Sequence, residues 1–238
     1  HTTGARNIAI GDLAMTDTNA GSTSLGSADN VFIGYNAGGG TWTDAASNQN
    51  IGIGTNVLNA AMAGALNNTA VGHGSAGAIT SGDSNSIFGY LAGAAITTGG
   101  NNVIIGASAG DGFTANTTMT LIGAEAGTTI NSNNANGTVA VGYQSLGDLT
   151  SGATNTALGS KSGDAATTSS GSVFLGFDAG GTVTTGNQNI AIGLDSMNGG
   201  ATTGDNNIAI GFSAGDALTS GFRNVFVGQN AGGAAQGA

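Results

Sequence analysis

A glycine recurs along the whole chain at nearly constant spacing, and this repeat restricts the possible folds more than any other feature. Thirteen copies of one phrase, roughly Asn, apolar, any residue, apolar, Gly, cover the 238 residues. Seven of the twelve intervals between anchoring glycines are 17 residues, and the others are 18 to 23. Such a unit is too short for paired helices or a propeller blade, so we expect each to be one coil of a β-solenoid. The anchoring glycines are Gly11, Gly34, Gly54, Gly72, Gly89, Gly106, Gly123, Gly142, Gly159, Gly176, Gly193, Gly211 and Gly228.

The composition excludes the main competing fold classes. The chain has 46 Gly but no Pro and no Gly-X-Y period, which excludes collagen. Gly, Asn and Thr disfavour helix interiors, whereas 39% apolar residues are enough for a packed core. The sequence therefore predicts an all-β protein, a β-solenoid (β-roll or β-helix) of about 13 coils of ~17 residues. We expect a single solenoid domain over 1–238, with loop insertions near 15–30, 38–49, 55–67 and 128–137.

Side-chain alternation within each strand predicts an inside and an outside. The residues three and one before each glycine, here called the flanking columns, are mostly β-branched and apolar, and we assign them to the interior. The residue two before each glycine, the central column, should then point outward, although it contains only Ala, Gly and large apolar residues. An apolar stripe of this length predicts packing between chains, most simply as a homotrimer, while a flat roll with this strand wedged against the facing wall is the alternative. The predicted inter-chain residues are Phe32, Ile87, Ile104, Leu121, Phe174 and Phe226.

An asparagine precedes ten of the thirteen glycines by four residues. Stacked asparagines at a corner bond backbone groups of their own coil and of the next, and Asn tolerates turn conformations. We interpret the column as a structural ladder rather than as a ligand-binding row. Its members are Asn7, Asn30, Asn50, Asn68, Asn85, Asn102, Asn155, Asn189, Asn207 and Asn224.

A second recurring phrase, Thr-Thr-Gly or Thr-Ser-Gly, predicts a second short strand in each coil. Its first residues form a threonine column that we expect to face solvent. A regular threonine row on a rigid, weakly charged solenoid is also typical of ice-binding surfaces, which keeps an ice-binding solenoid open as an alternative function. The column comprises Thr80, Thr97, Thr114, Thr150, Thr167, Thr184, Thr202 and Thr219.

Charge and residue types argue against several functions. With 3 basic against 13 acidic residues, the chain lacks the cations that bind phosphates, so we expect no nucleic-acid partner. No apolar run is long enough for a membrane span, so we expect no membrane insertion. There is no Cys, and the two histidines, His1 and His73, are far apart, which leaves no parts for a metal site or a histidine-based triad. Asp178 and Asp195 share a column, but we interpret them as solvated turn residues; we expect no enzyme activity, no cofactor and no metal.

Aromatic residues provide the best candidates for binding. Tyr35, Tyr90 and Tyr143 directly follow anchoring glycines, where exposed rings at a corner could stack on sugars; shielding of a junction between chains is the alternative. Trp42, with Asp44 beside it, lies in a loop insertion and is the best single candidate for a receptor contact. A hydrophobic plug at the N-terminal end of the solenoid is the alternative interpretation of Trp42.

The segments NVFIGYNAGGG and NIAIGFSAGDALTSGFRNVFVGQNAG carry a resemblance to known proteins. They resemble the repeats of bacteriophage tail-fibre proteins, and the head repeats of trimeric autotransporter adhesins. The resemblance spans nearly the whole chain and implies a trimeric, left-handed β-roll outside the cell, on a virion or a cell surface. It implies a structural or adhesive rod, with itself as partner and a cell-surface glycan or receptor as a second one. The alternatives are a subunit that stacks end to end into an extracellular filament, and the ice-binding solenoid.

Overall fold

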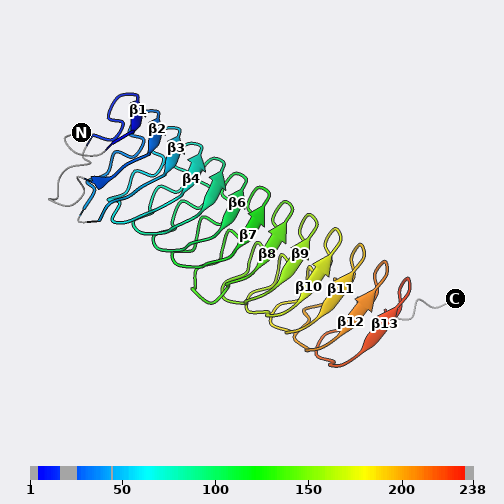
Figure 1. Cartoon of the computed structure of the whole chain (residues 1–238). Helices are drawn as coiled ribbons and strands as arrows, with labels where there is room; N and C mark the ends of the chain where they lie inside the picture. Colours follow the sequence, from blue (N-terminus) through cyan, green and yellow to red (C-terminus); the bar gives the residue numbers. More distant parts are fainter. Residues whose placement is uncertain (1–4, 17–25, 44, 234–238) are drawn as a thin grey trace. The chain divides into compact units, whose positions relative to one another are not determined.

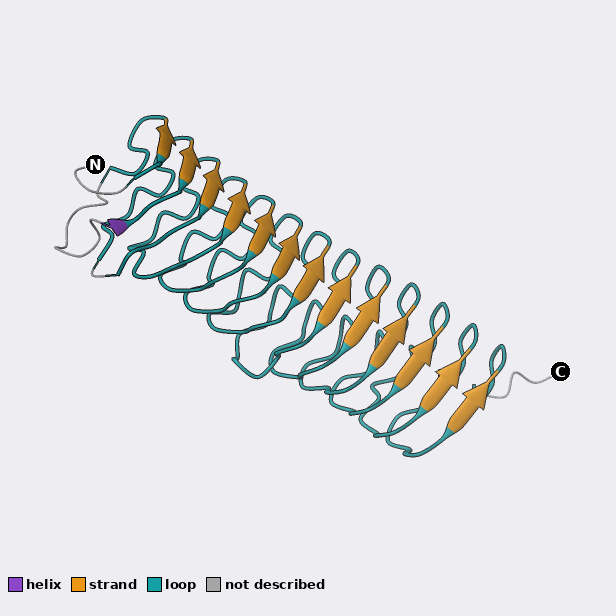
Figure 2. Cartoon of the chain, viewed as in Figure 1, coloured by secondary structure: helices purple, strands orange, loops and turns teal. Residues whose placement is uncertain are grey.

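The protein is an all-β parallel β-solenoid of about 12 turns. The computed structural model describes residues 5–16, 26–43 and 45–233, and these residues contain no α-helix. Figure 1 shows one coil following the next, and Figure 2 shows that each coil contributes one strand while loops and turns, with one short helical segment near the N-terminal end, form the rest. The chain divides into two compact units, 1–119 and 120–238, which are described separately below.

Unit 1 contains six strands that pair in parallel with their neighbours in sequence order. Each strand is three residues long and pairs in register, so that Val31, Phe32 and Ile33 lie beside Ile51, Gly52 and Ile53. The strands are β1 (Ile8–Ile10), β2 (Val31–Ile33), β3 (Ile51–Ile53), β4 (Thr69–Val71), β5 (Ser86–Phe88) and β6 (Val103–Ile105).

Unit 2 repeats the same arrangement with seven strands. Val173, Phe174 and Leu175 pair with Thr156, Ala157 and Leu158 on one side and with Ile190, Ala191 and Ile192 on the other. The strands are β7 (Thr120–Ile122), β8 (Val139–Val141), β9 (Thr156–Leu158), β10 (Val173–Leu175), β11 (Ile190–Ile192), β12 (Ile208–Ile210) and β13 (Val225–Val227). In both units the strands coincide with the three residues before each glycine.

The second strand expected at the Thr-Thr/Ser-Gly phrase is absent from the described coils. The backbone there does not form a ladder, because consecutive N–H groups converge on one oxygen. Thr80, Ser81 and Gly82 all donate to the Thr97 carbonyl, at 2.9, 3.2 and 3.2 Å. Isolated bridges such as Val183 to Thr202 are what is left of strand pairing on this side. This wall is therefore a stack of tight turns.

The anchoring glycines have a conformation that other residues avoid. All thirteen have φ between 120° and 143°. At Gly159, for example, φ is 143° and an added Cβ would collide with the carbonyl oxygen of Gly176 in the next coil. Glycine is needed here both for its backbone conformation and for the close approach of successive coils.

The central column lies inside the solenoid, so the predicted direction of the strand side chains was wrong. Phe32, Ile87, Ile104, Leu121 and Phe174 have no exposed surface within the single chain, and Phe226 in the last coil is half-buried. These six residues form core and not the predicted contacts between chains. The reason is steric, because the large rings need small residues beside them: a Cβ on Gly52 would lie 2.6 Å from the Phe32 ring. The flanking columns consequently point out of the coil.

Candidate interaction surfaces

An exposed apolar sheet face is the most prominent surface feature of each unit. It consists of the two flanking columns, and no charged residue occurs in them. In unit 1, Ile53, Phe88 and Ile105 keep 38, 38 and 39% of their surface exposed. In unit 2, Leu158 and Leu175 keep 48 and 40%. The central residues between them are buried, so each strand divides the apolar residues between the core and this apolar face.

An aromatic corner borders the apolar face, one residue after each glycine. Of the tyrosines proposed from the sequence, Tyr35, Tyr90 and Tyr143 are all exposed, at 50, 56 and 47%. The Tyr90 ring stacks on His73 of the preceding coil, with ring centroids 5.5 Å apart and an interplanar angle of 25°. Phe177 and Phe212 extend this corner in unit 2 with similar exposure. In each unit the aromatic corner thus follows the apolar face along the chain, with one glycine between them.

Trp42 does not lie on the surface, so the prediction of a receptor contact at this residue is wrong. It has no exposed surface, its ring meets Phe32 edge-on at 5.8 Å, and its indole N–H donates to the Gly38 carbonyl at 3.1 Å. The loop insertion turns this large ring into the coil, where it adds core volume. Asp44, its proposed companion, lies outside the described residues.

The asparagine column makes a continuous chain of buried hydrogen bonds in unit 1. Each side-chain oxygen accepts both the backbone N–H and the amide N–H of the next asparagine. For the Asn85 oxygen these donors belong to Asn102, at 3.2 and 2.9 Å. The Asn85 amide nitrogen donates to the Asn68 oxygen and to the Gly99 carbonyl, both at 2.9 Å. Each asparagine thereby ties together consecutive coils.

The ladder continues in unit 2 with a substitution that other side chains compensate. Ser172 stands where an asparagine is expected. Its backbone N–H donates to the Asn155 oxygen at 3.0 Å, and its hydroxyl accepts the Asn189 N–H at 3.1 Å. Ser169 takes over the missing bond to the Gly186 carbonyl, at 2.6 Å. The two serines together replace one asparagine, a pairing that no spacing rule in the sequence indicated.

The ladder is imperfect near the boundary of the two units. Met119 closes the unit 1 ladder through its backbone N–H, which donates to the Asn102 oxygen at 2.9 Å. The buried amide of Asn116 and the buried hydroxyl of Thr138 have no hydrogen-bond partner. Met119 and Thr138 stand where the repeat otherwise has Asn, and the unpaired polar atoms of Asn116 and Thr138 accompany this interruption of the ladder.

The threonine column is mostly half-buried, and Thr114 and Thr219 are exposed. The hydroxyls of Thr80, Thr150 and Thr167 donate to carbonyls of the following coil, at 3.2, 2.8 and 3.2 Å. Thr202 is fully buried. These hydroxyls therefore tie successive coils together along this wall.

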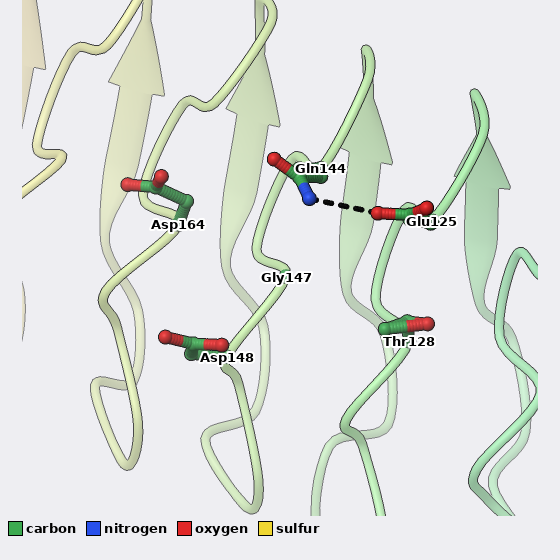
Figure 3. Close-up of a pocket in the computed structure, with 6 residues that line it drawn as sticks. All are labelled: Glu125, Thr128, Gln144, Gly147, Asp148 and Asp164. Atoms are coloured by element: carbon green, nitrogen blue, oxygen red, sulfur yellow. Dashed lines mark hydrogen bonds between the residues drawn. The ribbon is translucent and has the colours of Figure 1, made fainter.

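A polar groove runs along another corner of unit 2 (Figure 3). One pocket of this groove, of about 230 Å³, is lined by Glu125, Thr128, Gln144, Gly147, Asp148 and Asp164. Gln144 donates to the Glu125 carboxylate at 2.7 Å. Partial burial raises the pKa of the Asp164 carboxyl, and the charges of Asp178 and Asp148 raise it further. Within the described residues, no three His, Cys, Asp or Glu side chains are grouped so as to hold a metal ion.

Comparison of the chain with protein-family models, curated proteins and solved structures gives no match. Among the described residues, none belongs to a helix that is long and apolar enough to cross a membrane.

Proposed function

We propose that this chain is a structural segment of a rod and carries out no catalysis. The same bonded coil, repeated along the chain, would bear mechanical load. The observation that supports this most directly is the buried asparagine ladder, which repeats the same bonds from coil to coil in each unit. A polar side chain with all its bonds made inside a core fixes one register and one direction of growth. An architecture that grows along one axis suits a spacer or shaft better than a site that encloses a small substrate.

The rod is proposed to act as a homotrimer outside the cell, as a shaft segment of a phage tail fibre or of a bacterial surface adhesin. The resemblance of the repeats to those of such fibres motivates this assignment. The apolar surface of each unit supports it physically, since a surface of this kind is costly to leave in water. In an alternative arrangement that leaves these rings outside the contact between chains, the exposed tyrosines Tyr35, Tyr90 and Tyr143 would offer flat surfaces for a cell-surface glycan.

Solution mass tests this proposal. Light scattering after size exclusion should give a discrete mass of three chains, and negative-stain images of the same fraction should show short rods of uniform length. Long filaments whose length grows with concentration would favour end-to-end assembly instead. A monomer at all concentrations would refute the trimeric shaft.

A further inference from the structure

The size of the apolar face indicates whether it is large enough to bind a partner stably. In unit 2 the apolar face and the aromatic corner together expose on the order of 1,000 Å² of apolar side chain, compared with roughly 300–600 Å² for the largest patch on a typical monomer. A standard protein interface takes about 800 Å² from each partner. The surface of one unit is therefore large enough for a stable interface.

We infer that copies of this chain meet through the apolar face and the aromatic corner, with Leu158, Leu175 and Phe177 of unit 2 at the contact. This inference rests on the proposed homotrimer and identifies the surface that holds it together. It places the contact on the side chains one residue before and one residue after the anchoring glycine, and not on the buried central column.

The spacing of the side chains favours a second copy over other occupants. The apolar face presents one side chain per column per coil, at the strand separation of about 4.8 Å. A second copy in parallel orientation presents the same spacing. The side chains of one chain can therefore fit between the side chains of the other over many coils. An unrelated globular partner or a lipid surface has no such period.

The distribution of charge also permits self-association. The chain has a formal charge of −10, which opposes contact between copies through an acidic surface. None of that charge lies in the flanking columns. In unit 2, Glu125, Asp148 and Asp164 line the polar groove instead. Copies that meet through the apolar face keep these carboxylates away from the contact.

A matched pair of lysine variants tests the assignment. Leu175→Lys places a charge on the apolar face, and Thr168→Lys places the same charge at an exposed position of another wall, a few residues earlier. We expect Leu175→Lys to lower the mass from three chains to one in light scattering, while Thr168→Lys keeps the wild-type mass. Because both side chains are exposed in the single chain, circular dichroism of both variants should keep the β-sheet spectrum.

A second measurement avoids placing a charged side chain in the contact between chains. The natural chain has no cysteine, so Leu175→Cys and Thr168→Cys each introduce a single thiol. We expect maleimide to react at least about tenfold more slowly with the Leu175→Cys variant, because access controls thiol reactivity. A wild-type trimer whose mass survives Leu175→Lys, with equal reaction rates for the two thiols, would overturn this inference and leave the trimeric shaft standing. A wild-type monomer would refute both.

Discussion

Removing one rung of the asparagine ladder tests the principal stabilising element of unit 1. Asn85 is 1% exposed and its side chain takes part in four hydrogen bonds, with Asn68, Gly99 and twice with Asn102. Asn85→Ala removes all four and leaves buried groups without partners. At a net value of about 0.5–1.5 kcal/mol per bond, the expected loss is about 4 kcal/mol of unfolding free energy. That is a large share of the ~5–15 kcal/mol that stabilises a typical domain.

Trp42 makes the measurement specific to unit 1. It is the one tryptophan of the chain and is buried in the same unit as Asn85. Urea unfolding should be followed by its fluorescence and in parallel by circular dichroism, which reports both units. The fluorescence midpoint should fall strongly in Asn85→Ala.

Two further variants make the result interpretable. Thr98→Ala changes an exposed side chain of the same region and should stay within about 0.5 kcal/mol of wild type. Asn85→Asp keeps the shape but replaces the amide donor by a buried carboxylate facing the Asn68 oxygen, so it should cost more than alanine. A loss below about 1 kcal/mol for Asn85→Ala would show that the bonds are not worth the stated value and would refute the reasoning.

Three other substitutions probe the core, the coil corner and the groove. Phe174→Ala should cost about 3–5 kcal/mol in denaturant unfolding, because the ring fills the core; a loss under 1 kcal/mol would contradict its burial. Gly159→Ala should cost at least about 3 kcal/mol and reduce soluble yield, because the new Cβ meets both an unfavourable φ and the Gly176 carbonyl; wild-type thermal stability would contradict this. The pKa of Asp164 is raised, so its ionisation destabilises the fold as pH rises from the ordinary Asp value of about 4 through the raised value. Asp164→Asn should therefore raise the melting temperature at pH 7 but not at the acid end of that window, and an equal shift at both pH values would contradict this account.

The repeat unit, the strand positions and the parallel solenoid could be predicted from the sequence because they depend on local, repeated constraints. Each coil has a glycine with φ near 140°, and three strand residues precede it, of which the first and third mostly favour β-structure. This combination leaves few alternative folds. The ladder follows in the same way, since asparagine at a fixed distance from that glycine has the same neighbours in each coil.

Other features depend on contacts between different positions of the coil, which an alignment of the repeats does not reveal. The Thr-Thr/Ser-Gly phrase has strand-forming residues, yet its N–H groups converge on one carbonyl, as at Thr97, and no strand forms. Trp42 lies in an insertion, where exposure is the usual expectation, but the space beside the Phe32 ring draws it inward. The serine pair that substitutes for a missing asparagine is a cooperative solution between two positions and has no signal in either column alone.

The direction in which the strand side chains point was predicted wrongly. All three columns are largely apolar, so alternation alone cannot show which face of the strand is buried. The deciding signal was nevertheless present in the sizes and polarity of the side chains. Polar residues occur in the flanking columns, as Thr69, Ser86, Thr120 and Thr156, and never in the central one. Each phenylalanine of the central column has only Ala or Gly beside it in the adjacent strands, as Phe174 has Ala157 and Ala191. Small residues on both sides of each large ring are a requirement of close packing inside a narrow coil. An outward face has no such requirement, and this is why Ile, Val and Leu residues that resemble a core can occupy the exposed face.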